Sequence, residues 1–215
     1  MHLKRQKTPK SWPIFRKGTK YVVRPGFSPE KGIPVLVLLR DILKVASDRK
    51  ETKRAIYLKQ VFVNNKPLTD EKKNVLLLDT LTLIPQKKYY RLGISEKGKF
   101  NLEEIKENES NFKISKIMNK KVLKEKKTQL NLNDGKNFLS EIDCKVGDSV
   151  LINFKERKIE KCIPLKEKTG VLVFAGKHSG KKGILKKIDE EHKITELEVN
   201  GESINVLIKQ LLAVE

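Results

Sequence analysis

Apolar residues recur at helical spacing over two neighbouring stretches in the first third of the chain. Residues 35–46 place apolar side chains three and four positions apart, which gives a helix one apolar face. These side chains are Val35, Leu38, Leu39, Ile42, Leu43 and Ala46. A second helix is predicted from about Arg49 to Gln60, because Asp48 stands three residues before Glu51, a pattern typical of a helix start.

Short apolar runs follow the two helices and predict strands. Val61–Val63 precedes the turn-forming segment Asn64–Pro67, and the runs Leu76–Leu78 and Leu81–Ile84 come next. We expect these last two runs to pair with each other as strands. The helices and strands together predict a compact α+β domain.

Alternating apolar and polar residues predict a second, mainly β body farther along the chain. Phe112–Ile117 and Thr128–Leu132 alternate as half-buried strands do. Asn133–Lys136 is a hairpin-type turn, and Val146–Ile152 turns into another strand. Short strands at close spacing predict a small barrel.

A glycine-rich loop separates two further strand-like runs, Val171–Phe174 and Ile184–Leu185. Glycines allow sharp turns and let a phosphate approach backbone amides, while lysines supply positive charge. The candidate RNA-binding residues of this loop are Gly176, Lys177, His178, Gly180, Lys181, Lys182 and Gly183. The acidic residues that begin at Asp189 would mark the end of this basic face.

Charge decides the class of partner. The chain of 215 residues carries a formal net charge of +20, and such an excess is usually neutralised in the working state. Nucleic-acid phosphates do this with release of counterions. The sequence has no basic amphipathic helix, no run of 18 apolar residues and no signal-peptide core, so we expect a soluble, intracellular protein with no membrane partner.

The first 33 residues form a basic arm in which cations precede any acidic residue. The arm's candidate RNA-binding residues are Lys4, Arg5, Lys7, Lys10, Trp12, Arg16, Lys17, Lys20 and Arg24. Aromatic residues between cations favour stacking on bases combined with neutralisation of phosphates. Two alternatives remain: a solvated tail, or an arm whose Trp12 and Phe15 pack on the protein's own body.

No catalytic, metal or cofactor site is predicted. Cys144 and Cys162 lack the ligand set of a zinc site and are interpreted as reduced, partly buried thiols. The segment Ala175–Lys182 nearly matches a nucleotide-binding P-loop, but Lys182 stands where Ser or Thr should bind magnesium. A β-prone residue rather than a helix also follows. We therefore predict that the chain is not an enzyme and has no small-molecule substrate.

Two segments resemble known RNA-binding modules. The basic helix pair followed by VFVNNKPLTDEKKNVLLLDTLTLIP is similar to the small RNA-binding domain named after ribosomal protein S-four, with Asn65 where Gly is usual. Asn tolerates the left-handed conformation that Gly would supply. The glycine-rich loop resembles the KOW motif of SH3-like barrels. By resemblance, Arg40, Lys44, Arg49, Lys50, Lys53 and Arg54 would face RNA; the alternative is a solvated helix face.

The order of these modules, with an opening HLKRQKTPKSWPIFRKGTKYVVRPGFSPE and the segment QLNLNDGKN, resembles archaeal members of the e-type small-subunit ribosomal protein S-four family. The resemblance implies an α+β, mostly β fold in four parts: a basic arm (1–33), an S-four-like domain (34–92), a central β domain (93–167) and a KOW SH3-like domain (168–215). It also implies a cytoplasmic protein held permanently on small-subunit rRNA beside other ribosomal proteins.

Three rival functions make different demands on the sequence. An RNA-modifying enzyme would need a catalytic body, which the central 75 residues are too short to supply. A free RNA chaperone or KOW-type transcription-elongation factor would bind RNA without staying on the ribosome. A module that binds acidic proteins would leave the aromatic residues of the arm unexplained.

Overall fold

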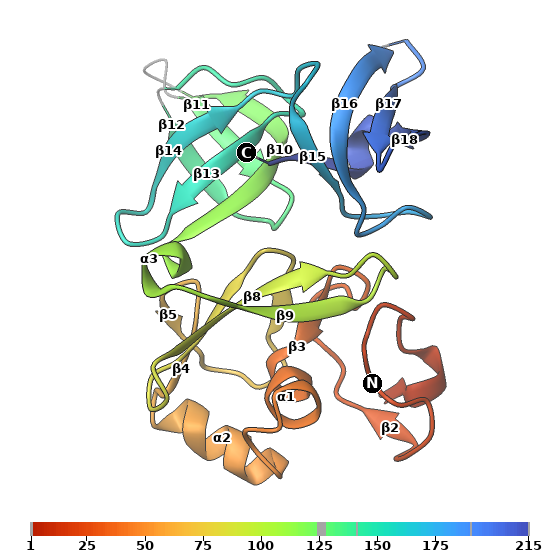
Figure 1. Ribbon diagram of the computed structural model, residues 1–215. Helices are drawn as coiled ribbons and strands as arrows, with labels where there is room; N and C mark the ends of the chain where they lie inside the picture. The colour runs from red at the N-terminus through yellow and green to blue at the C-terminus, as the bar shows by residue number, and fades with distance from the viewer. Residues whose placement is uncertain (1, 124–127, 141, 190, 215) are drawn as a thin grey trace. The chain divides into compact units, whose positions relative to one another are not determined.

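The computed structural model describes residues 2–123, 128–140, 142–189 and 191–214. The chain forms two compact units. The first comprises Met1–Ile94 and Lys99–Asn111, and the second comprises Ser95–Gly98 and Phe112–Glu215. Strands dominate and helices are few and short, which confirms the predicted α+β, mostly β class (Figure 1).

The first unit combines short helical segments with small antiparallel sheets. Its elements are β1 (Leu3–Lys4), η1 (Arg5–Lys7), β2 (Tyr21–Val22), β3 (Gly32–Pro34), α1 (Val35–Val37), η2 (Leu38–Ile42), α2 (Arg49–Tyr57), β4 (Val61–Val63), β5 (Lys66–Pro67), β6 (Asn74–Leu76), β7 (Thr80–Leu83), β8 (Lys88–Ile94), β9 (Phe100–Ile105) and α3 (Glu107–Ser110). One sheet has the order β5-β4-β7-β8-β9, and β1 pairs with β2.

The first predicted helix is shorter and more buried than expected. α1 continues into η2, a π turn in which the Leu43 amide donates to the Leu38 carbonyl. The helix ends before Lys44, which has φ 54°. Val35 and Val37 are fully buried, so the segment has no solvent face along α1.

The second helix begins where predicted, at Arg49, and ends three residues early, at Tyr57. The Glu51 carboxylate accepts a hydrogen bond from the Ser47 amide at 2.7 Å, which ties the residue before the Asp48 cap position to the first turn of the helix. Lys59 takes a left-handed conformation, φ 52°, and the Gln60 amide donates back to the Ala55 carbonyl. This is a Schellman-type end.

The Asn64-Asn65 turn confirms the conformation predicted for it. Both residues have positive φ, 52° and 57°, and they join β4 to β5. The Asn64 side chain also donates to the buried Asp79 carboxylate at 2.7 Å.

The predicted pairing of the two strands around Asp79 is wrong: β6 pairs with β3, and β7 pairs with β4 and β8. The Asp79 carboxylate accepts from the Leu76 amide and turns the chain between the two sheets.

The arm is part of the core of the first unit. Trp12 packs in the same apolar cluster as Leu38, Leu81 and Phe100. The Phe100 amide also donates to the Ser11 carbonyl at 2.8 Å. Residues near the start of the chain are therefore fixed against a strand that lies almost 90 residues later.

The second unit contains two five-stranded antiparallel sheets. Its elements are β10 (Phe112–Val122), β11 (Thr128–Leu132), β12 (Asn137–Ser140), β13 (Ser149–Asn153), β14 (Lys158–Ile163), β15 (Gly170–Val173), β16 (Lys182–Asp189), β17 (Ile194–Val199), β18 (Glu202–Leu207), η4 (Ile208–Gln210) and β19 (Leu211–Ala213). The sheet orders are β12-β11-β10-β13-β14 and β18-β17-β16-β15-β19.

The long strand β10 curls the first of these sheets. Its first half, Phe112–Lys116, pairs with β13, and its second half, from Ile117, pairs with β11. A bulge lies just after Ile117, and the edge strands β12 and β14 lie close together. A separate apolar cluster that includes Ile117 and Ile152 fills this small barrel.

Specific hydrogen bonds join the two sheets of the second unit. The buried Lys116 ammonium on β10 donates to the carbonyls of Ile208 and Leu211. The Ala213 amide of β19 donates to the Ser149 hydroxyl at 2.9 Å. Among the described residues, no helix is both long and apolar enough to cross a bilayer.

Candidate nucleic-acid interface

The arm is a folded loop organised around Arg5. The Arg5 guanidinium donates to the Thr19 carbonyl at 2.8 Å, to the Thr19 hydroxyl at 2.7 Å and to the Phe15 carbonyl at 2.9 Å. Arg16 donates to the Thr8 carbonyl at 3.2 Å. Because its donors are used inside the arm, Arg5 shapes the loop that presents the other cations.

Trp12 corrects one prediction. Its side chain is only 3% exposed, and its indole N–H donates to the carbonyls of Pro29 and Gly32 at 2.9 and 3.0 Å. A buried ring cannot stack on a base, so the predicted RNA contact by Trp12 is wrong and the alternative of packing on the body is correct for it. Phe15, at 89% exposed, remains available for stacking.

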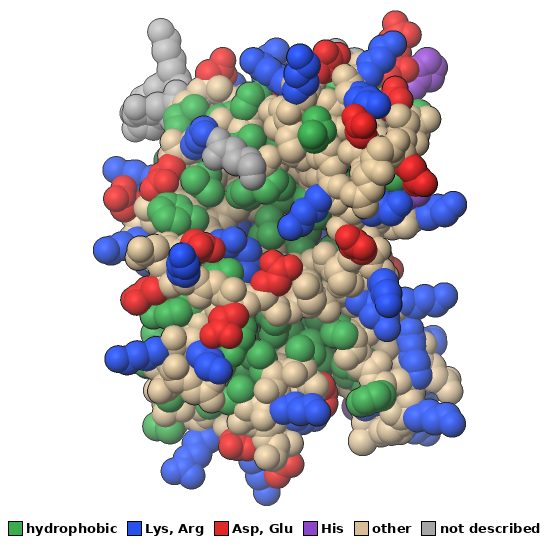
Figure 2. Space-filling view, in the orientation of Figure 1, with side chains coloured by type: hydrophobic (Ala, Val, Ile, Leu, Met, Phe, Trp, Pro, Cys, Tyr) green, Lys and Arg blue, Asp and Glu red, His purple; other side chains and the backbone are tan. Residues whose placement is uncertain are grey.

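The other cations of the arm lie at the surface. Figure 2 shows Lys and Arg side chains along the edge of the first unit that the arm forms. The exposed residues are Lys4, Lys7, Lys10, Arg16, Lys17, Lys20 and Arg24. The Lys20 ammonium lies 5.6 Å from the centre of the Tyr21 ring, so cation and aromatic ring are adjacent here.

The basic helix α2 carries two kinds of cation. Lys50, Lys53 and Arg54 are exposed, and none makes an ion pair with another described residue. Arg49 instead donates two hydrogen bonds to the buried carboxylate of Glu71, and this raises the pKa of Arg49 above its ordinary value. The charge of Arg49 is therefore partly neutralised within the protein.

Arg40 and Lys44 also differ in whether the positive charge is paired within the protein. Arg40 forms a two-bond ion pair with Asp41, at 2.9 and 3.1 Å, and this hydrogen bonding raises the pKa of Arg40. Lys44 is exposed at the end of the π turn.

Tyr57, not among the predicted site residues, is 85% exposed at the end of α2, one turn after Lys53. Helical spacing from the cations could have indicated it.

The glycine-rich loop is fixed by its own backbone. Gly176 and Gly180 have φ of 90° and 93°, which side-chain-bearing residues rarely adopt. At Gly183 a Cβ would lie 2.4 Å from the Glu198 carbonyl oxygen of the neighbouring strand. The glycines therefore serve the turn and the sheet.

Three amides of the glycine-rich loop are used within the protein. The amides of Ser179, Gly180 and Lys181 donate to carbonyls of the same segment, at 3.3, 2.7 and 3.2 Å. These three amides are not available to a phosphate, so the exposed cationic side chains are the main candidate contacts of the loop. Lys177 and Lys182 are exposed, and His178 and Lys181 are partly exposed. Strand β16 begins at Lys182, which is not the helix that a P-loop requires.

The described residues contain no group of three His, Cys, Asp or Glu side chains that could hold a metal ion. Cys144 and Cys162 are free thiols, as interpreted from the sequence. Burial, followed by the neighbouring Cys144, raises the pKa of the Cys162 thiol to about 12. A thiol with so high a pKa is a poor nucleophile at neutral pH.

Two family models match this chain. The model described as ribosomal family S4e matches residues 86–159, and the RS4NT (NUC023) domain model matches residues 1–27. The crystal structure of the 30S ribosomal protein S4e from Thermoplasma acidophilum has a TM-score of 0.72 and 21% sequence identity. The match covers 86% of this chain and 95% of the Thermoplasma chain, and it shows that the two chains have the same fold.

Curated relatives extend the match over most of the chain. The small ribosomal subunit protein eS4 of Methanothermobacter thermautotrophicus is 38% identical over 191 residues, which is 87% of this chain and 79% of that protein. The eS4 protein of Methanocella arvoryzae is 39% identical over 190 residues, 87% of this chain and 80% of that protein. These identities confirm the resemblance drawn from the sequence: the chain belongs to the eS4 family of small ribosomal subunit proteins.

Proposed function

We propose that this chain is a structural constituent of the small ribosomal subunit and binds small-subunit rRNA through exposed cations on folded elements. Relatives at 38 and 39% identity carry the name of that subunit. The cytoplasmic ribosome is then its location, and rRNA and neighbouring ribosomal proteins are its partners. The role requires no cofactor and no catalytic group.

One observation carries the proposal: in a chain with a net charge of +20, exposed cations lie on folded loops and on a helix. Exposed cations lie on the arm held by Arg5, on α2 and on the loop that ends at Lys182. Fixed cations match phosphates at defined positions, so they recognise the shape of a folded RNA. A disordered tail would neutralise charge without selecting a shape.

We divide the proposed contacts into two roles. The direct phosphate contacts are Lys4, Lys7, Lys10, Arg16, Lys17, Lys20, Arg24, Lys44, Lys50, Lys53, Arg54, Lys177, Lys181 and Lys182. Arg5, Arg40 and Arg49 hold the surfaces in shape through their internal hydrogen bonds. Several basic surfaces on one chain act multivalently, since the first contact raises the effective concentration of the others.

Sedimentation of a cell lysate through sucrose in high salt tests the proposal. We expect the protein to migrate with the small subunit at about one copy each, because several surfaces that bind at once must all dissociate before the protein is released, even though each phosphate contact weakens as salt rises. A protein that washes off or runs free would contradict a permanent role, and would favour a free RNA chaperone or elongation factor instead.

A further inference from the structure

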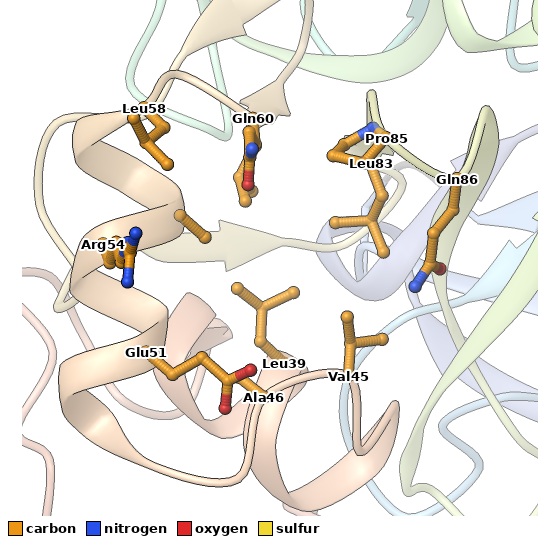
Figure 3. A pocket seen from close by; sticks show the side chains of 12 residues that line it. Leu39, Val45, Ala46, Glu51, Arg54, Leu58, Gln60, Leu83, Pro85 and Gln86 are labelled. Carbon is orange, nitrogen blue, oxygen red and sulfur yellow. The ribbon is translucent and has the colours of Figure 1, made fainter.

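An apolar cavity of about 380 Å³ lies beside α2 in the first unit. Figure 3 shows the side chains of Leu39, Val45 and Leu83 converging on it, with Leu58, the residue after α2, on one side and Pro85 on the other. The volume falls within the ~300–1,000 Å³ that is usual for small-ligand pockets. Leu58 is 52% exposed and Val45 40% exposed, so the rim of the apolar lining faces solvent, while Leu39 and Leu83 form its buried floor.

Three polar side chains also line the cavity with groups that can bind a ligand. Arg54 comes from α2, Gln60 from the segment after it, and Gln86 from the β7–β8 turn (Figure 3). Among the residues that the structure describes, neither glutamine amide has a hydrogen-bond partner. The remaining charged side chain, Glu51, already accepts from the Ser47 amide.

The surroundings of the cavity are positively charged. Lys53, Lys59 and Lys87 are exposed and stand next to lining residues in the sequence. With Arg54 they favour an occupant that carries negative charge, and the aliphatic walls favour one with a flat apolar body. The two glutamine amides favour one whose edge both donates and accepts hydrogen bonds.

An unpaired nucleotide meets all three demands. We propose that this cavity binds one base that is turned out of the RNA, with its faces between aliphatic side chains, its edge on Gln60 and Gln86, and its phosphate near Arg54. The inference rests on the proposed function and adds a site to it. Bases that are turned out of a stack are read in this way, by apolar contact and edge hydrogen bonds.

An acidic peptide is the competing occupant, and the glutamines argue against it. An aliphatic or aromatic peptide side chain in the cavity would cover both amides without pairing them, and covered polar groups without partners oppose binding. A base pairs them, since a glutamine amide matches the donor–acceptor pattern of a base edge.

Methyl NMR of the full-length protein tests the assignment with defined probes. The probes are the 5′-monophosphates of adenosine, guanosine, cytidine and uridine, with ribose 5-phosphate and a short acidic peptide containing phenylalanine as comparisons. We expect at least one nucleotide to shift the methyl signals of Leu39, Val45 and Leu83 saturably. Equal shifts with ribose 5-phosphate would overturn the base contact, and shifts with the peptide alone would make the cavity a protein-docking site.

Two variants sharpen the result. Ala55→Leu fills the cavity from α2 and should weaken nucleotide binding by about tenfold or more. Gln86→Ala, at an exposed turn, should weaken it by about fivefold, the size of one hydrogen bond, and keeps the test usable if Ala55→Leu folds poorly. Gln6→Ala, at another exposed glutamine, is the matched control and should have no effect.

Sedimentation with ribosomal subunits separates this inference from the proposed function. No saturable methyl shift, with normal migration on the small subunit, would overturn the base site and leave the ribosomal role intact. A protein that binds nucleotides in the cavity and yet runs free of subunits would overturn the ribosomal role, because the base site would then serve another RNA.

Discussion

The Lys113 ammonium on β10 lies 3.0 Å from the Asp134 carboxylate in the β11–β12 turn, and both side chains are inaccessible to solvent, at 2 and 4% exposed. Burial disfavours the Asp134 carboxylate, but Lys113 and Lys136 outweigh it and lower the pKa of Asp134 below its ordinary value. This buried ion pair fixes the hairpin turn against the long strand of the central barrel.

We expect Asp134→Asn to lower the free energy of unfolding of the second unit by about 3–5 kcal/mol, because it leaves the buried Lys113 charge without its carboxylate. The Asp134 carboxylate should also make the stability of the native protein depend on pH in the acid range. The folded pKa of Asp134 is depressed, so its contribution is complete above the unfolded pKa of about 3.9 and is lost as pH falls through the folded value. Urea unfolding at neutral and acid pH measures both effects.

The control is Asp143→Asn, at an aspartate whose side chain is 93% exposed while it pairs with Lys120. Only a small loss of stability is expected there. An equally small loss for Asp134→Asn would contradict the assigned role of the buried pair.

Lys116 should make the stability of the second unit depend on pH in the alkaline range. Burial lowers the pKa of Lys116 to about 8, against the opposing attraction of Asp148. Between about pH 8 and the unfolded value of about 10.4, the unfolded chain binds the proton and the folded one does not, so this group makes stability rise with pH. Lys116→Met should remove that slope in unfolding curves, whereas Lys187→Met, at an exposed lysine of β16, should keep it.

The double variant Lys50→Glu with Lys53→Glu tests the RNA face of α2. We expect unchanged circular dichroism and poor incorporation into small subunits, because both lysines are exposed and would repel phosphates after reversal. Arg49 is left in place, since reversing it would set a second carboxylate against the buried Glu71. Lys155→Glu with Lys158→Glu, exposed in the central barrel, is the control, and equal incorporation of the two variants would remove α2 from the interface.

Charge reversal of Lys177, Lys181 and Lys182 should weaken RNA binding and flatten its dependence on salt. Each phosphate contact that is lost reduces the slope of log affinity against log salt by slightly less than one. Because the loop backbone is fixed by its own hydrogen bonds, we expect the fold to survive. Binding titrations at several salt concentrations measure the slope, and an unchanged slope would exclude these lysines as phosphate contacts.

Trp12 and Phe15 should respond to substitution in opposite ways. Trp12→Ala should lower the free energy of unfolding of the first unit by about 3–5 kcal/mol, since it empties a core position. Phe15→Ala should leave stability within about 0.5 kcal/mol. If Phe15 stacks on a base, its loss weakens RNA binding by about 1–3 kcal/mol. Thermal unfolding and RNA titration of both variants distinguish packing from stacking.

Local patterns predicted those elements whose residues follow a clear spacing. The Asn64-Asn65 turn and the start of α2 depend on residues close in sequence, and both appear where expected. Features set by distant residues were missed. Glu71 neutralises Arg49 from 22 positions away, and β6 pairs with β3 and not, as expected, with β7.

In the candidate interface, too, local residue types predicted some features, while contacts between distant residues set others. The residue types of the arm predicted a basic surface, but only three-dimensional packing separates the buried Trp12 from the exposed Phe15. The cavity beside α2 could not be predicted, because its lining comes from a helix, a loop and a strand turn that are spread over almost 50 residues.

The hydrogen bond from the Phe100 amide to the Ser11 carbonyl has a consequence for synthesis of the chain. Translation adds about 5–20 residues per second, so strand β9 emerges roughly 5–20 s after the arm. During that interval Trp12 lacks the partner strand that completes its pocket, and a strongly cationic segment with an uncovered indole is presented to the cell. Nascent chains of this protein therefore pass through a window in which they are most prone to bind stray polyanions.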